Sequence, residues 1–306
     1  MSDVRIEGFT ADRFGAVRDV FANNLASGAD LGASFCVTIA GETVVDLWGG
    51  HADEARTRPW ERDTIVNVWS TTKTMSAICL LMLADRGELD LDAPIAEVWP
   101  EFAANGKAAI TPAQVLGHTA GLSGWDPTIS GADLYDWDRA VGVLAAQAPW
   151  WEPGTTSGYH ALTQGYLEGE IVRRVTGRTI GTFFREEVAG PLGADFHIGL
   201  PESEEPRVGE MVPPSVGLEG DVSAAGVDLT SIAMRSLLSA SITGAECNTR
   251  EWRAAEIPAA CGLNWLVQLA IGSASSGLFE VVVPRTMKEV TKPSVPVPPG
   301  LLSPLQ

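Results

Sequence analysis

The sequence of 306 residues contains little of what several classes of protein need. Its four cysteines, Cys36, Cys79, Cys247 and Cys261, are widely spaced, with no Cys-x-x-Cys pair and no histidine cluster nearby. This spacing argues against a zinc site and against a dense disulfide framework, so we expect reduced thiols, no metal and no organic cofactor. No run of about 18 apolar residues and no basic start before an apolar run occurs, which predicts a cytoplasmic protein without a membrane span.

The charge balance is strongly acidic. Asp and Glu number 39 against 21 Lys and Arg, which gives a net charge of −18 at pH 7 and a pI near 4.5. Nucleic acid and anionic membranes repel such a chain, so we expect neither as a partner. Hydrophobic residues make up 45% of the chain, which is enough for the core of one large domain or of two interleaved ones.

Apolar periodicity predicts the elements of the N-terminal part. Helical spacing predicts an amphipathic helix over residues 11–27, and two β-rich runs at 33–40 and 43–48 predict a hairpin. Gly41 stands in the two-residue link, where a tight turn requires a positive φ angle. Helix signals dominate residues 90–200, and no internal repeat is present.

Ser70 and Lys73 are the first candidates for chemistry. A helical stripe begins after Ser70 and ends near Gly87, so the two side chains lie one turn apart at a helix N-terminus. Serine becomes a nucleophile only with a base in hydrogen-bond reach, and a lysine with a lowered pKa can be that base. With 4 lysines and 20 serines, about 0.3 such pairs arise by chance, and a serine N-cap beside a solvated lysine is the alternative.

The pair opens an ordered series of segments: STTKT at 70–74, ADRGELDLDAP at 84–94, LGHTAGL at 116–122, WEPG at 151–154 and YHA at 159–161. Over residues from about 10 to 260, the series resembles the serine β-lactamases and penicillin-binding proteins. Within that family it is most similar to the class C-like branch of family VIII carboxylesterases. The order of the motifs makes this resemblance far more specific than one serine–lysine spacing.

The resemblance implies a β-lactamase-like fold of the α/β plus all-α class, in which an antiparallel sheet flanked by helices carries an inserted helical domain. We expect residues 1–80 and about 200–260 to form the sheet domain, and residues 81–200 to form the helical domain. The candidate site would then lie at the junction of the two domains, where ligand pockets tend to form.

The resemblance also implies roles for the matching residues. Ser70 would be the acylated nucleophile, Lys73 its proton acceptor, and Tyr159 the hydroxyl that moves a proton between nucleophile and leaving group. Lys73 and Tyr159 would titrate as a coupled pair. A Ser-His-Asp triad built on His51, His118 or His197 is the alternative from the residues alone, but the chain has no Gly-x-Ser-x-Gly elbow.

Ala161 bears on the substrate. Family members that act on β-lactams commonly carry asparagine there, whose amide contacts the substrate, and alanine donates nothing. This departure favours small esters with short acyl chains, and Trp69, Trp125 and His160 are the candidates to line the pocket. The alternatives are β-lactamase or D-alanyl-D-alanine peptidase activity, or a non-catalytic binding protein of the same fold.

The C-terminal segment departs from the family pattern. It lacks a Lys-Thr-Gly or His-x-Gly motif, and the run 292–300 has too many prolines for a helix or a central strand. We therefore expect residues 261–306 to be an atypical, partly irregular tail, with C-terminal strands missing. The hairpin would then lack sheet partners and expose an apolar edge that favours self-association. One oxyanion-hole donor would also be absent, which typically costs about 100- to 1000-fold in rate.

Overall fold

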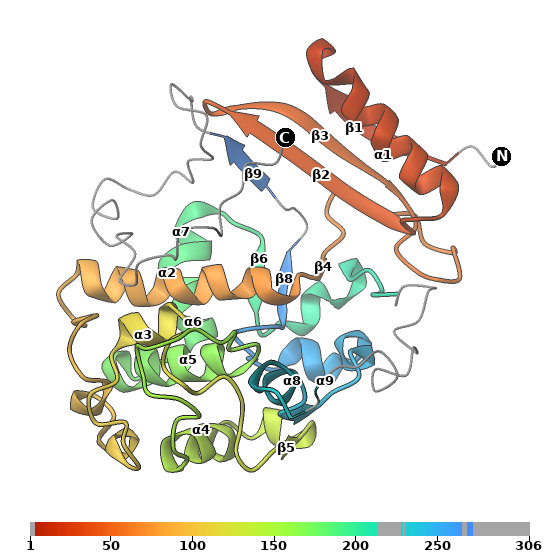
Figure 1. The fold of residues 1–306 in the computed structure, drawn as a ribbon. Helices are drawn as coiled ribbons and strands as arrows, with labels where there is room; N and C mark the ends of the chain where they lie inside the picture. Colours follow the sequence, from red (N-terminus) through yellow and green to blue (C-terminus); the bar gives the residue numbers. More distant parts are fainter. Residues whose placement is uncertain (1–3, 213–227, 229, 265–267, 272–306) are drawn as a thin grey trace.

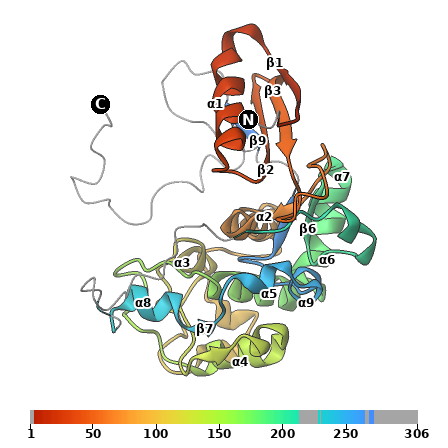
Figure 2. The ribbon, with the colours of Figure 1, turned by 90° about the vertical axis from the view of Figure 1, so that its right-hand side faces the viewer.

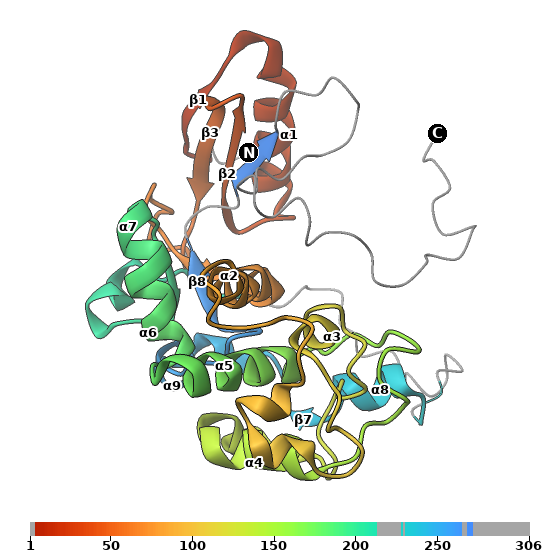
Figure 3. The ribbon, with the colours of Figure 1, turned by 90° about the vertical axis from the view of Figure 1, so that its left-hand side faces the viewer.

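The computed structural model describes residues 4–212, 228, 230–264 and 268–271. The described chain contains a four-stranded sheet covered by one helix, and a larger helical part that includes two small sheets. The helix α2 (Thr72–Asp85) lies between the four-stranded sheet and most of the helical part in all three views (Figures 1, 2 and 3). The proline-rich run at 292–300 lies outside the described residues.

The four-stranded sheet has the order β1-β3-β2-β9. Its strands are β1 (Ile6–Thr10), β2 (Gly32–Ile39), β3 (Glu42–Gly50) and β9 (Gln268–Ile271). The β2–β3 hairpin is the predicted one, and Gly41 in its turn has a φ angle of 83°. The amphipathic helix α1 (Gly15–Ser27) packs its apolar side chains against one face of the sheet (Figure 2).

The expectation that the hairpin lacks sheet partners is wrong. β1 pairs with β3 on one side in antiparallel register, and β9 pairs with β2 on the other side in parallel register. β9 and the short strand β8 (Gly262–Asn264) both come from the segment that we expected to carry no strands. Backbone groups make these pairings, so the missing family motif did not prevent them.

A second, three-stranded sheet connects the two parts of the molecule. It has the order β4-β8-β6, with β4 at Val66–Asn67 and β6 at Phe196–Ile198, and both neighbours run antiparallel to β8. β4 leads directly into the turn before α2. A strand from residues 262–264 therefore lies beside the start of the helix that carries Lys73.

The helical part is built around α2 and α5 (Thr163–Thr176), which pack against each other. Its other elements are α3 (Pro112–Leu116), α4 (Trp137–Ala146), α6 (Ile180–Phe184), α7 (Gly190–Leu192), α8 (Ile232–Leu237), α9 (Arg250–Ala254), β5 (Ile129–Ser130) and β7 (Ala240–Ser241). Side chains of these elements, apart from α7 and α8, share one large apolar core. No helix of the described part is both long and apolar enough to cross a membrane. The domain boundaries inferred from the sequence stay a prediction.

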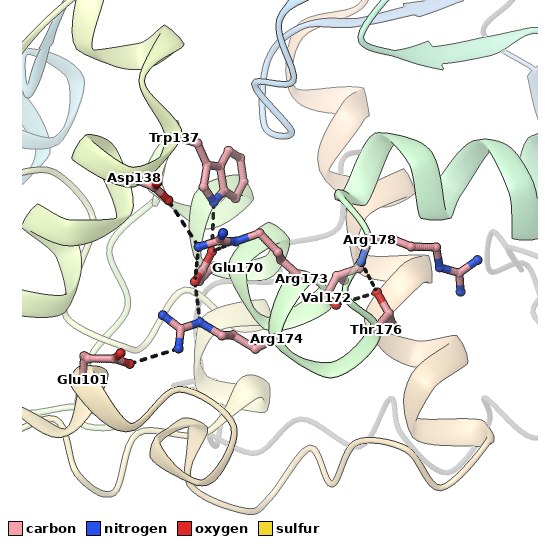
Figure 4. Close-up of polar contacts among 9 residues, drawn as sticks. All are labelled: Glu101, Trp137, Asp138, Glu170, Val172, Arg173, Arg174, Thr176 and Arg178. Carbon is pink, nitrogen blue, oxygen red and sulfur yellow. Dashed lines mark hydrogen bonds and ion pairs between the residues drawn. The ribbon is translucent and has the colours of Figure 1, made fainter.

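Glu170 organises the C-terminal half of α5. Its side chain is fully buried and accepts hydrogen bonds from Trp137 Nε1 at 2.9 Å, Arg173 Nε at 2.7 Å and Arg174 Nε at 2.7 Å (Figure 4). Arg174 also reaches Glu101, and Arg173 reaches Asp138. The Glu170 carboxylate thus bonds α5 to α4, and its partner Arg174 bonds α5 to the segment that follows α2. These contacts fix the position of α5.

We expect Glu170→Ala to lower the free energy of unfolding by about 2 kcal/mol, because Trp137 and two guanidinium groups lose their acceptor. The expected loss is smaller than for a fully buried ion pair, because both arginines are about one-third exposed and therefore partly hydrated. Urea unfolding would measure the loss. The control is Glu186→Ala, which removes an exposed ion pair with Arg178 and should cost less than about 1 kcal/mol. Equal losses in the two variants would contradict this role of Glu170.

Candidate active site

Ser70 lies in a single 3₁₀ turn, Trp69–Thr71, that leads into α2, and its side chain is exposed. Strand β8 holds this turn from both sides, because the N–H of Val68 donates to the carbonyl of Gly262 at 2.9 Å and the N–H of Gly262 donates to Thr72 Oγ1 at 2.9 Å. Thr72 Oγ1 in turn donates to the carbonyl of Trp69 at 2.5 Å. These contacts hold the backbone of Trp69, directly before Ser70, in the left-handed region, with a φ angle of 46°.

Gly262 is a site-supporting residue that the sequence analysis missed. A Cβ atom at this position would lie 2.4 Å from Thr72 Oγ1 and 2.7 Å from the ring of Phe196, so only glycine allows the strand to approach the turn. In the sequence, the one signal for this position is a glycine that directly follows Cys261. Without the fold, nothing links that glycine to the residues before α2.

Lys73 is nearly buried, with 8% of its surface exposed, and its Nζ atom lies 3.1 Å from Ser70 Oγ. Nζ also donates to the carbonyl of Ala161 at 2.7 Å and to the carbonyl of Ala259 at 2.9 Å. Removal from water lowers the pKa of Lys73, because burial penalises the ammonium more than the free amine. The lysine is thus held beside Ser70 with its free-base form favoured relative to a lysine in water.

Tyr159 completes a cluster of three side chains. Its hydroxyl donates to Ser70 Oγ at 2.6 Å, and Lys73 Nζ lies 4.9 Å from the centre of its ring. Tyr159 comes from the loop before α5, and its side chain is 48% exposed. The structure therefore brings together the three residues, Ser70, Lys73 and Tyr159, for which the sequence predicted a shared role.

Two histidines, His118 and His160, pack in and against the loop that carries Tyr159. The ring of His118 lies 5.0 Å from the ring of Tyr159, and its Nδ1 accepts the backbone N–H of His160 at 3.1 Å. The His160 ring is fully buried between the carbonyl of Gly158 and the N–H of Leu122. Burial lowers the pKa of His118 to about 4 and that of His160 to about 3, with Lys73 adding to the effect on His118. Both rings are therefore neutral at pH 7.

The other predicted site residues lie in different surroundings. Trp69 is beside Ser70 and half-buried, with its ring 5.9 Å from that of Trp252. Trp125 is 1% exposed and donates its Nε1 to the carbonyl of Ala140, so it belongs to the helical core. His160 is likewise buried. Contrary to the expectation from the sequence, neither Trp125 nor His160 presents a surface to an acyl pocket, because packing covers both rings.

The alternative with a histidine base gains no support from the geometry. His197 is paired with Asp195 on β6, and His51 lies in a bridge to Pro59. Within the described part of the chain, the side-chain partners of Ser70 Oγ are Lys73 and Tyr159. The side chains that contact the Ser70 hydroxyl are therefore an amine and a phenol.

The chain belongs to the β-lactamase family, because the family model described as Beta-lactamase matches residues 17–286. It is 41% identical over 238 residues to the esterase/beta-lactamase LipL of Mycobacterium tuberculosis, which covers 76% of this chain and 53% of LipL. The esterase EstB of Burkholderia gladioli is 30% identical over 226 residues, covering 63% of this chain and 57% of EstB. The chain thus spans about half the length of these relatives.

Solved structures agree with this assignment. The fold is similar to a family VIII carboxylesterase with a TM-score of 0.74 and 46% identity, over 85% of this chain and 68% of that one. A penicillin-binding protein homologue from Caulobacter crescentus matches with a TM-score of 0.70 and 44% identity over the same shares. The family and the β-lactamase-like fold predicted from the sequence are confirmed.

Proposed function

We propose that this chain is a serine hydrolase that cleaves short-chain carboxylic esters through an acyl-enzyme on Ser70. The observation that carries the proposal is the position of Ser70 Oγ, which is exposed and lies 3.1 Å from Lys73 Nζ and 2.6 Å from the Tyr159 hydroxyl. A nucleophile within hydrogen-bond reach of a base is the common signature of covalent catalysis by serine.

The proposed reaction has two halves. Lys73 as the free amine takes the proton of Ser70 while Oγ attacks the ester carbonyl, and Tyr159 passes its proton to the departing alkoxide. Lys73 then returns a proton to Tyr159, so that both groups regain their starting protonation states before the second half. The acyl-enzyme then reacts with water, whose proton goes to the same base, and the acid is released as Ser70 regains its proton. α2 begins two residues after Ser70, and the positive end of its dipole would favour the negative charge that develops on the carbonyl oxygen.

The preference for simple esters rests on residue 161. The carbonyl of Ala161 is occupied by Lys73, and its side chain is a methyl group that offers no hydrogen bond to an acylamide. EstB is named as an esterase and LipL as an esterase/beta-lactamase, which supports ester hydrolysis. β-Lactamase or peptidase activity is the second candidate, favoured by the penicillin-binding protein homologue. A rate on a cephalosporin above that on p-nitrophenyl butyrate would reverse the preference.

Labelling with a fluorophosphonate probe tests the proposal directly. We expect one covalent adduct, which peptide mass mapping places on Ser70. A Ser70 that stays unlabelled while the protein is folded would instead identify a binding protein that has lost the reaction. The probe reports the nucleophile without depending on which ester is the natural substrate.

We expect Tyr159→Phe to lower kcat for p-nitrophenyl butyrate by about 100- to 1000-fold, the usual contribution of a proton-transferring group. Folding should be unaffected, since the hydroxyl is at the surface and its partner in the structure is Ser70. The matched control is Tyr135→Phe, because Tyr135 lies in the helical part of the molecule and packs against its core. If the two variants hydrolysed the ester equally well, Tyr159 would have no part in proton transfer.

A further inference from the structure

A second titratable group lies behind the candidate site. Glu168 is on α5, fully buried, and its Oε1 accepts a hydrogen bond from Gln164 Nε2 at 2.8 Å. Among the residues that the structure describes, Glu168 Oε2 has no hydrogen-bond partner, and neither does the buried Gln164 Oε1 one turn earlier. An ionised carboxylate with one unsatisfied oxygen is costly in such surroundings, so the neutral acid is favoured.

Glu168 faces the part of α2 that carries Lys73. α5 and α2 pack against each other, and the carboxyl group interacts electrostatically with Lys73 and with the thiol of Cys79. Lys73 Nζ directs its hydrogen bonds to Ser70 and to two carbonyls, so the carboxyl group acts on it through the electric field. Burial raises the pKa of Glu168 to about 8, while burial lowers that of Lys73, so the two shifts bring the titrations of the two groups closer together.

The other titratable groups near Glu168 and Lys73, in the described part of the chain, do not obscure the coupling between these two residues. Burial raises the pKa of the Cys79 thiol well above its usual range, so the thiol stays neutral. His118, which feels Lys73, is neutral above about pH 5 because burial lowers its pKa to about 4. Tyr159, on the other side of Lys73, is the catalytic partner already described. Gln164, the hydrogen-bond partner of Glu168, carries no charge.

We propose that Glu168 is a positioning residue that acts through Lys73: the two groups compete for one proton, and Glu168 sets the pH at which Lys73 becomes the free base. This inference rests on the proposed role of Lys73. Loss of one proton from the pair gives either neutral acid with free amine, which is competent, or carboxylate with ammonium, which is not. A carboxylate in this position stabilises the ammonium and so delays formation of the base.

The test is the pH dependence of kcat/KM for p-nitrophenyl butyrate in Glu168→Gln, because this parameter reports the pKa values of the free enzyme. Glutamine removes the competing proton site, so we expect the acid limb to move to lower pH by about one unit. The plateau should change little. Glu152→Gln, at an exposed position in the loop before Tyr159, is the matched control and should leave the limb in place.

Infrared spectroscopy gives a second measurement on the intact wild-type chain. The C=O stretch of a protonated buried acid should be present at pH 7 and disappear above the pKa of Glu168. An unmoved acid limb in a folded Glu168→Gln variant, or the absence of that band, would overturn the inference and leave the proposed function standing. Full activity in Lys73→Met would instead remove the proposed function itself. If the glutamine variant did not fold, the infrared band would still decide.

Discussion

Replacement of Ser70 by alanine is expected to lower kcat for p-nitrophenyl acetate or butyrate by about 10⁵- to 10⁶-fold, as loss of a serine nucleophile does elsewhere. In the proposed mechanism the Ser70 hydroxyl forms the covalent intermediate, so its removal would leave Lys73 and Tyr159 nothing to activate. Residual hydrolysis would come from binding and from the backbone N–H groups at the start of α2.

The serine variant should fold like the wild type, because Ser70 is exposed and its hydroxyl holds no other part of the structure together. Ser27→Ala is the matched control, since Ser27 is an exposed serine at the end of α1 whose hydroxyl bonds to the carbonyl of Asn24. That variant should keep full activity and full labelling by the fluorophosphonate probe. Ester hydrolysis that survived in Ser70→Ala would mean that the nucleophile lies elsewhere.

Lys73→Met is expected to lower kcat/KM by about 1000- to 10,000-fold, the upper part of the range for a general base. It should also destabilise the protein by about 1 to 3 kcal/mol, because the buried carbonyls of Ala161 and Ala259 lose a donor. Steady-state kinetics and urea unfolding would measure the two effects separately.

Lys107→Met is a close control for Lys73→Met. Lys107 is also fully buried and donates its ammonium to the carbonyls of Ala104 and Gln147, and burial lowers its pKa to about 8. Lys107→Met should destabilise the protein by a similar amount and leave kcat unchanged. If both variants lost activity in proportion to stability, Lys73 would be a structural lysine rather than a base.

The sequence sufficed for features that depend on local geometry. Two residues three apart at the start of an apolar helix share a face, so the spacing made a Ser70–Lys73 contact possible, and the order of the motifs that follow favoured it. The hairpin followed from the β-rich runs on either side of Gly41, whose φ angle of 83° lies in the left-handed region.

Features that depend on contacts between distant parts of the chain could not be predicted from the sequence. The carbonyl of Ala259 that fixes Lys73, and the pairing of β9 with β2, join segments that no short motif connects. Trp125 shows a different limit, because an aromatic residue after a glycine-rich motif packs equally well in a core or in a pocket. Glu168 was invisible for a similar reason: only the packing of α5 on α2 shows that this carboxyl group is buried.

The bonds from β8 to the turn at Ser70 have a consequence for synthesis. Gly262 and Thr72 are 190 residues apart, so the loop that must close before the nucleophile is fixed is long. During translation, α2 can form early, but the turn before it has no strand to hold it until residue 262 has left the ribosome. A nascent chain therefore carries Ser70 and Lys73 for most of its growth without the bonds from β8 that fix the turn at Ser70.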